Sequence, residues 1–370
     1  MHLERNIVFW LAALVVFVAL LWLLSPVLLP FVLGMAIAYV LDPLAERLTR
    51  RGMSRLIAAL VILLCFLAVF VTLLVLIVPI LAHQLSALIE DAPNYAKRLQ
   101  ALVSDPKYPW LKHVIGDNLA GANQSVGDLL NQASGYLTGL LASVWERGRA
   151  LISIFSLLVI APVVAFYLIC DWDRMVDAFD RLIPLPQRDT VRGLFKEMDR
   201  AISAYVRGQS SVCLFLGSYY ALGLTLAGLS YGVLIGVVSG LISFIPYVGS
   251  LTALVLSLAV ATAQFFPDWS SILIVAGVVL LGQFLESNVL SPYLVGHSVG
   301  LHPVWLMFAL IAFGYLFGFV GLLLAVPLAA AAGVLIRFAV RRYLASPLYT
   351  GEEPAQIGFS TGRTDPPPSS

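Results

Sequence analysis

Long stretches without any charged side chain constrain the fold of this sequence more than any other feature. In the second half of the chain, residues 208–267 and 287–336 contain no Asp, Glu, Lys or Arg, and shorter charge-free stretches cover residues 6–41, 56–89 and 150–170. A helix needs roughly 20 apolar residues to cross the hydrocarbon core of a bilayer. Each of the two long stretches therefore has room for more than one crossing, and we predict a membrane protein.

The composition of the chain excludes two other classes of protein. Only 12% of the residues are charged and 60% are hydrophobic, whereas a soluble globular protein carries about 25% charged residues. The mean hydropathy of +0.93 agrees with this imbalance. A net charge of +1 argues against a nucleic-acid partner, because a phosphate-binding surface needs a clear excess of Lys and Arg. We predict neither a soluble enzyme nor a nucleic-acid-binding protein.

The apolar stretches are continuous, which favours helices over the alternating strands of a membrane barrel. We therefore predict an all-α fold, a polytopic helical membrane protein with about eight membrane segments that include two broken hairpins. The expected segments are 6–24, 27–41, 56–82, 150–170, 210–229, 231–266 (two arms), 271–290 and 304–340 (two arms).

Arginine residues predict the orientation of these segments. Arg47, Arg50, Arg51 and Arg55 follow the second expected helix, and cytoplasmic loops of membrane proteins are enriched in Lys and Arg. The turn at Ser25-Pro26 is too short for anything but a tight hairpin, so we expect the N-terminus on the cytoplasmic side as well. An even number of crossings and the arginines near residue 340 place the C-terminus there too.

The pattern of apolar and polar segments divides the chain into five parts. Residues 83–149 are polar but keep helical spacing, which predicts a helical domain outside the cytoplasm. It could bind a partner, form an oligomer contact, or pack on itself as a hairpin. The expected parts are 1–82 (N-terminal transmembrane helices), 83–149 (extracytoplasmic helical domain), 150–207 (a transmembrane helix and a cytoplasmic amphipathic helix), 208–343 (a transport core) and 344–370 (a disordered cytoplasmic tail).

Two apolar segments of the second half are interrupted in the middle. Residues 231–266 contain Pro246 within Phe244–Ser250, and proline breaks a helix because it lacks a backbone donor. Residues 304–340 contain the glycine-rich stretch Gly314–Gly321, which permits a sharp turn. Parity predicts that the two hairpins open toward opposite faces, as in the inverted repeats of secondary transporters. The alternative is two ordinary pairs of helices.

Several small or ionisable residues in this core are candidate functional positions. Gly232, Gly236 and Gly240 recur every four residues, which predicts close packing of helices. Glu286 is a carboxylate inside an apolar region, and such groups are costly in a membrane and often functional. Gln283 shares its expected helical face. The alternative is that Glu286 lies hydrated near the end of its helix.

The sequence contains no pattern typical of an enzyme. There is no phosphate-binding GxxxxGK[ST] loop, no HExxH, no GxSxG and no CxxC pair. The three cysteines, Cys65, Cys170 and Cys213, all lie in apolar runs, where we expect them to act as small hydrophobic residues. We therefore predict no enzyme activity, no catalytic residues, no cofactor and no metal site.

Short motifs along the chain resemble those of the autoinducer-2 exporter family, the PerM-like permeases. The resemblance covers about residues 5–345. Its motifs are Pro30–Gly34, Ala38–Leu44, Tyr205–Gln209, Phe244–Gly249, Glu286–Asn288, Ser291-Pro292, Val295-Gly296, Gly300–Pro303, Gly318–Gly321 and Ala325–Pro327. The resemblance implies a permease of the bacterial inner membrane with about eight helices. Members are linked to export of autoinducer-2, and some to exchange of sodium or lithium for protons.

These observations lead to three functional hypotheses. The first is a secondary permease that exports a small solute, such as an autoinducer-2-like molecule, by alternating access. The second is a Na⁺(Li⁺)/H⁺ antiporter that uses Glu286, and the third is a membrane scaffold without transport that acts through residues 83–149. The expected partners are the lipid bilayer, a small-molecule or ion substrate and, in one alternative, further copies of the chain in a homo-oligomer. The predicted substrate or translocation residues are Pro246, Tyr247, Gly249, Gln283, Glu286, Asn288, Gly318 and Gly321.

Overall fold

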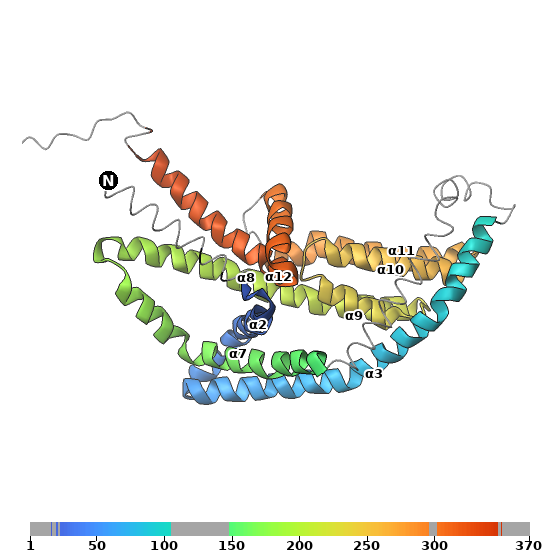
Figure 1. Cartoon of the computed structure of the whole chain (residues 1–370), viewed down its shortest axis with the longest axis horizontal. Helices are drawn as coiled ribbons and strands as arrows, with labels where there is room; N and C mark the ends of the chain where they lie inside the picture. The colour runs from blue at the N-terminus through green and yellow to red at the C-terminus, as the bar shows by residue number, and fades with distance from the viewer. Residues whose placement is uncertain are drawn as a thin grey trace, which may run out of the picture.

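The computed structural model describes residues 16, 20, 23–104, 148–295, 302–346 and 349, and within these ranges the chain forms helices joined by short turns, without a strand. The all-α prediction is therefore confirmed. The α-helices are α2 (Ser25–Thr49), α3 (Arg55–Ser104), α7 (Gly148–Leu182), α8 (Arg188–Leu226), α9 (Gly232–Ile242), α10 (Val248–Phe265), α11 (Trp269–Leu285) and α12 (Pro303–Leu344) (Figure 1). A 3₁₀ turn, η2 (Leu185–Gln187), and a π-helix, η3 (Glu286–Val295), complete the described elements.

Five of the described helices are long and apolar enough to cross a membrane. They are Val27–Thr49, Arg55–Asp91, Val248–Phe265, Trp269–Leu294 and Pro303–Leu344, and Gly232–Ile242 is a shorter apolar helix. Large apolar side chains in the middle of α3, such as Val75 and Leu76, are more than half exposed. A soluble protein rarely exposes contiguous apolar surface of this extent. The protein is therefore a polytopic helical membrane protein.

Helices α2, α3 and α7 form an N-terminal bundle. Alanine is frequent at its buried positions, and small side chains let membrane helices approach closely. The buried cluster contains Ala38, Leu41, Ala45, Ala59, Ile62, Leu63, Ala165 and Ile169. The helix expected at 6–24 lies mostly outside the described residues. Helix α2 begins at Ser25 and continues to Thr49, beyond the expected end at 41, and the arginine-rich loop shrinks to a short turn around Gly52.

Helix α3 is longer than the predicted membrane segment 56–82. It contains 50 residues and continues to Ser104, so the first third of the segment expected outside the cytoplasm belongs to the same helix. Apolar contacts support the start of this extension, because Leu85 and Leu88, together with Leu81 just before it, pack against the core formed by α8–α11. Figure 1 shows α3 curving along the molecule from the N-terminal bundle toward that core. Residues 105–147 of the expected outer domain lie outside the described residues.

Helices α7 and α8 each join an apolar half to a charged half. The expected span 150–170 continues as α7 to Leu182, and the expected amphipathic helix and the span 210–229 form the single helix α8. Asp180 near the end of α7 binds Arg188 and Arg192 at the start of α8, with 2.5 Å between Asp180 Oδ1 and Arg192 Nε. Hydrogen bonds from these guanidinium groups hold the pKa of Asp180 well below its usual value.

Helices α9, α10 and α11 lie beside the C-terminal half of α8 and bury the main core (Figure 1). The predicted break between the arms of the first hairpin is present at Ser243–Tyr247. Helix α9 has only 11 residues, fewer than the expected arm. Gln264 closes the other end of the hairpin, where its amide donates to the oxygen of Gly228 at 2.9 Å and accepts from the Ser230 amide at 3.0 Å. The arms are thus antiparallel.

The second interrupted segment is helix α12, whose break is a single residue. Gly318 has φ 59° and ψ −136°, a conformation that L side chains rarely adopt. The arms fold back so tightly that a Cβ on Gly321 would lie 1.8 Å from the oxygen of Phe313. This break falls inside the predicted stretch Gly314–Gly321. The helix ends at Leu344, and most of the expected tail lies outside the described residues.

Candidate functional site

At the tip of the first hairpin, backbone carbonyl groups lack their helical hydrogen bonds, because the helix stops there. In place of the missing helical bonds, the hydroxyl of Tyr205 donates to the oxygen of Phe244 at 2.9 Å. The side-chain amide of Gln209 donates to the oxygen of Ser243 at 2.5 Å. Both donors belong to α8 and lie one helical turn apart. Unsatisfied backbone groups are costly away from water, so these two side chains allow the helix to break inside the protein.

Apolar contacts hold the same tip between α8 and α12. Ile245 is 5% exposed and packs with Leu310 and Ala325 on the two arms of α12. Phe244 meets Tyr205 edge to face, with ring centroids 5.9 Å apart. Gly318 is exposed and lies about two helical turns from this contact along the arms. The tip of one hairpin therefore meets the arms of the other hairpin, and the two tips do not meet.

Two residues of the predicted motif have special backbone requirements at this tip. Tyr247 has φ 67°, and a non-glycine residue in that region costs roughly 1–3 kcal/mol. Its side chain is half exposed. Gly249 is buried, and a Cβ at this position would lie 2.2 Å from Ser243 Oγ. Strained or crowded backbone of this kind gathers at functional sites, which makes the tip a candidate site.

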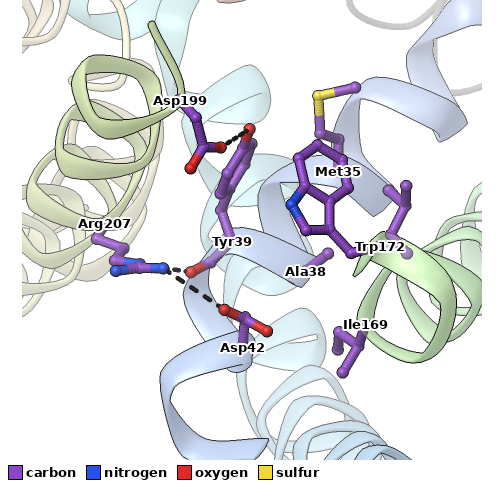
Figure 2. A pocket seen from close by; sticks show the side chains of 9 residues that line it. Met35, Ala38, Tyr39, Asp42, Ile169, Trp172, Asp199 and Arg207 are labelled. Carbon is purple, nitrogen blue, oxygen red and sulfur yellow. Dashed lines mark hydrogen bonds and ion pairs between the residues drawn. The ribbon is translucent and has the colours of Figure 1, made fainter. Parts of the chain in front are cut away.

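A cavity of about 60 Å³ is lined by side chains that include Tyr39, Asp199 and Arg207 (Figure 2). It is formed by α2, α7 and α8. The hydroxyl of Tyr39 donates to Asp199 Oδ1 at 2.9 Å, and Arg207 Nε donates to the backbone oxygen of Tyr39 at 2.7 Å. That oxygen lacks its helical donor because the residue four positions later is Pro43. Arg207 therefore replaces the bond that the proline removes.

Ion pairs near this cavity join residues of α2, α3, α7 and α8. The carboxylate of Asp42 lies 3.9 Å from Arg207 Nη2 and 3.5 Å from Arg55 Nη2. Arg55 also contacts α7, through the oxygen of Ile169 at 2.9 Å and Asp173 Oδ2 at 2.8 Å. The network provides both charge signs around a small cavity. It could hold a polar solute, or it could lock the N-terminal bundle to the core.

Glu286 lies apart from the hairpin tip, at the junction of α11 and the π-helix η3. One of its oxygens, Oε2, is buried without a hydrogen-bond partner. Its charge interacts with Tyr220 and Cys213 on α8. Gln283 and Asn288 are exposed, and the amide of Asn288 donates to the oxygen of Phe284 at 3.0 Å. Gln283 thus does not share the buried surroundings of Glu286.

The structure places the eight predicted site residues in three locations. Pro246, Tyr247 and Gly249 form the first hairpin tip, whereas Gly318 and Gly321 form the second. Gln283, Glu286 and Asn288 follow each other at the end of α11. The described residues contain no group of three His, Cys, Asp or Glu that could hold a metal ion.

The three glycines expected to pack helices lie on the seam between α9 and α8. A Cβ on Gly236 would lie 2.1 Å from the nitrogen of Ala221, and one on Gly240 would lie 2.3 Å from the Cα of Gly217. Gly232 approaches Thr225 in the same way. Backbone touches backbone along this seam, so the position of the hairpin on α8 depends on the absence of side chains.

The sequence analysis did not identify the side chains that hold these sites. The hairpin tip is held by Tyr205 and Gln209. The network at the cavity is formed by Arg207 with Tyr39 and Asp42. A signal was present, since Tyr205 and Gln209 are four residues apart and therefore share one face of a helix. A second signal was Asp42, which stands directly before Pro43 at the end of a long charge-free stretch.

Comparison with known proteins shows the family. The family described as "AI-2E family transporter" matches residues 11–341. The YrrI protein of Bacillus subtilis (strain 168) is 30% identical over 323 residues, which cover 85% of this chain and 87% of YrrI. PerM of Escherichia coli (strain K12) is 30% identical over 86% of this chain and 90% of its own length. The AI-2 transport protein TqsA of the same strain is 24% identical over 87% and 89%.

Proposed function

Since this chain belongs to the AI-2E transporter family, we propose that it is a secondary permease that exports a small polar or amphiphilic solute across the bacterial inner membrane. The observation that carries the proposal is the broken hairpin tip at Ser243–Tyr247. Its backbone is held by Tyr205 and Gln209 inside an otherwise apolar core. Non-helical backbone at membrane depth is tolerated only where protein or a water-filled cavity satisfies it, and transporters use such breaks to bind substrates.

The two arms of the first hairpin differ in length, because α10 has 18 residues and is long enough to cross a membrane, whereas α9 is shorter. Its 11 residues span about 16 Å, roughly half of the hydrocarbon core of about 30 Å. Gln264 ties the end of α10 to Gly228 and Ser230, so both arms start from the same level. The break at Ser243–Tyr247 is thus about 16 Å from the start of the short arm.

The polar network around Asp42 supports alternating access. Its ion pairs to Arg207 and Arg55 are long, at 3.9 and 3.5 Å, and the pair with Arg207 links the N-terminal bundle to the core. Exposed or partly exposed ion pairs contribute little stability, so a rearrangement between the two bodies would cost little at this point. Breaking these contacts would open the cavity between α2, α7 and α8.

The distribution of arginine supports an orientation with both termini in the cytoplasm. The turn between α2 and α3 carries Arg47, Arg50 and Arg51, and the end of α12 carries Arg341 and Arg342. Cysteine labelling from either side of the membrane tests this orientation. Labelling at residues 51 and 346 should require an inner-membrane-permeant reagent, and labelling by an impermeant reagent in intact cells would contradict it.

An autoinducer-2-like molecule is the first solute to test, because TqsA is named for AI-2 transport. Cells that lack the protein should retain the exported solute, and overexpression should lower its internal concentration. Untargeted metabolomics of cells and medium measures both. The variant Gln209→Leu, which removes the donor to Ser243, should fail to restore export although it reaches the membrane. Unchanged metabolite levels in both strains would overturn the proposal.

Exchange of cations for protons is a second candidate function. The buried oxygen of Glu286 without a partner favours it, because a carboxylate can alternate between a proton and a cation. In vesicles that contain the purified protein, sodium or lithium should dissipate an imposed pH gradient, and Glu286→Gln should abolish this effect. Export of a solute that persists in Glu286→Gln would favour the first function.

A further inference from the structure

Two buried polar atoms without a partner lie on facing elements, away from both hairpin tips. The hydroxyl of Tyr220 and the Oε2 atom of Glu286 are both inaccessible to solvent, and neither has a hydrogen-bond partner. Tyr220 as a whole is fully buried near the C-terminal end of α8. A buried hydroxyl or carboxylate that lacks a partner costs about 1–3 kcal/mol or more, so such atoms are rare without a reason.

Gly282 places these two groups on the same side of α11. A Cβ at this position would lie 2.7 Å from the hydroxyl oxygen of Tyr220 and 2.4 Å from its ring. The glycine therefore makes the space that the tyrosine occupies. Glu286 follows four residues later, one helical turn further along the same face. The charge of Glu286 interacts with Tyr220, in agreement with this placement.

The surroundings of Glu286 offer no fixed positive charge. Val212, Leu216 and Val279 are fully buried in the same core cluster as Tyr220. Across the described part of the chain, no Lys or Arg forms an ion pair with Glu286. The titratable groups that face it are Tyr220 and Cys213, both on α8. A carboxyl group in such surroundings is neutral when it carries a proton and needs a hydrogen-bond donor when it does not.

The backbone around Glu286 also departs from the regular helix. Glu286 is the first residue of the π-helix η3, which contains Pro292. Segments of π-helix occur frequently at functional sites, because they shift side chains out of the regular register of the helix. The shift begins at the residue whose oxygen is left without a partner.

We propose that Glu286 and Tyr220 form a proton-binding site. The carboxyl group of Glu286 takes up the proton, and the hydroxyl of Tyr220 donates a hydrogen bond to the carboxylate when the proton leaves. Coupling of this proton to transport rests on the proposed function, whereas the binding of the proton does not.

Labelling with dicyclohexylcarbodiimide tests the site without any transport. This apolar reagent enters membranes and modifies protonated carboxyl groups, so mass spectrometry of the full chain in lipid nanodiscs reports the protonation of Glu286 directly. Between pH 5.5 and 9, labelling of Glu286 should be strong at low pH and fall as the pH rises. Glu90, an exposed glutamate on α3, is the internal control and should stay nearly unlabelled.

The variant Tyr220→Phe tests the second half of the pair. Loss of the hydrogen bond to the carboxylate should move the midpoint of labelling upward by about one pH unit or more. Ser239→Ala is the matched control, because it removes another buried oxygen without a partner and should leave the midpoint unchanged. The proposal is overturned if Glu286 is labelled no more than Glu90 at every pH, or if the Tyr220→Phe profile coincides with that of the wild type. A transport assay without signal would count against the proposed function, but it would not change what the labelling shows about proton binding.

Discussion

The hydroxyl of Tyr205 lies 2.9 Å from the backbone oxygen of Phe244, and this hydrogen bond ties the middle of α8 to the break between α9 and α10. The neighbouring bond from Gln209 to Ser243 has the same role. Together they replace two helical bonds at the hairpin tip. Loss of either donor leaves a carbonyl group in the core without a partner.

Tyr205→Phe should therefore destabilise the protein by about 1–3 kcal/mol, the cost of a buried acceptor that loses its donor. Thermal unfolding of the purified protein in detergent measures the change. Tyr167→Phe is the control, because Tyr167 is 61% exposed on α7 and should tolerate the same substitution. Equal melting temperatures for the two variants would show that the bond does not support the tip.

Gly236→Ala should prevent stable folding. The new methyl group would overlap the backbone of Ala221, which cannot move aside as a flexible side chain would, and the expected loss is about 3 kcal/mol or more. Gly277→Ala on α11 is the matched control, since no atom lies within 4 Å of its Cβ position. That change should be neutral or stabilise the helix by up to about 1 kcal/mol. The yield of monodisperse protein in size-exclusion chromatography separates the two outcomes.

Arg207 and Pro43 should be energetically coupled. In the wild type, Arg207 supplies the donor to Tyr39 that Pro43 cannot supply. The substitution Arg207→Leu should cost about 1 kcal/mol more in the wild type than in a Pro43→Ala background, where the alanine amide can bond the same oxygen. A double-mutant cycle of unfolding free energies gives this difference. Additive effects would indicate that Arg207 acts only through Asp42.

Much of the fold follows from local features of the sequence. This is clearest for the two breaks in the helices of the second half. Pro246 and the glycines around Gly318 mark the two interruptions because each changes the backbone at its own position. The extension of α3 to Ser104 was only partly foreseen. Its apolar spacing predicted a helix, and in the structure that helix is the continuation of the membrane segment expected at 56–82.

The site itself depended on contacts between residues far apart in the chain. Tyr205 and Phe244 are 39 residues apart, and no local pattern specifies which carbonyl group a tyrosine will meet. Glu286 was recognised as a costly carboxylate. Its neighbour Tyr220 was not, because their contact depends on how α8 packs against α11 around Gly282. Packing of this kind is set by the whole core.

The stability that Asp180 gives to the turn between α7 and α8 should decrease at acidic pH. The pKa of Asp180 is lowered in the folded protein by its hydrogen bonds to Arg192 and Arg188. The contribution of Asp180 to the free energy of unfolding is therefore complete above about pH 4, the pKa of this group in the unfolded chain. It is lost as the pH falls from there toward the lower pKa of the folded protein. The difference in melting temperature between the wild type and Asp180→Asn should be constant from pH 6 to 8 and shrink below about pH 4. Asp177→Asn, at an exposed position nearby, should show no such trend.

Helix α3 contacts both bodies of the protein, through Leu63 in the N-terminal bundle and through Gln84, which accepts a hydrogen bond from the Leu234 amide at 2.8 Å. These two residues belong to one uninterrupted helix, so their spacing fixes an angle as well as a distance. Inserting a single residue between them would rotate Gln84 by about 100° around the helix axis and shift it by about 1.5 Å. Evolution can therefore change the length of this connection only in steps close to whole turns, since any other step would turn the glutamine away from the Leu234 amide.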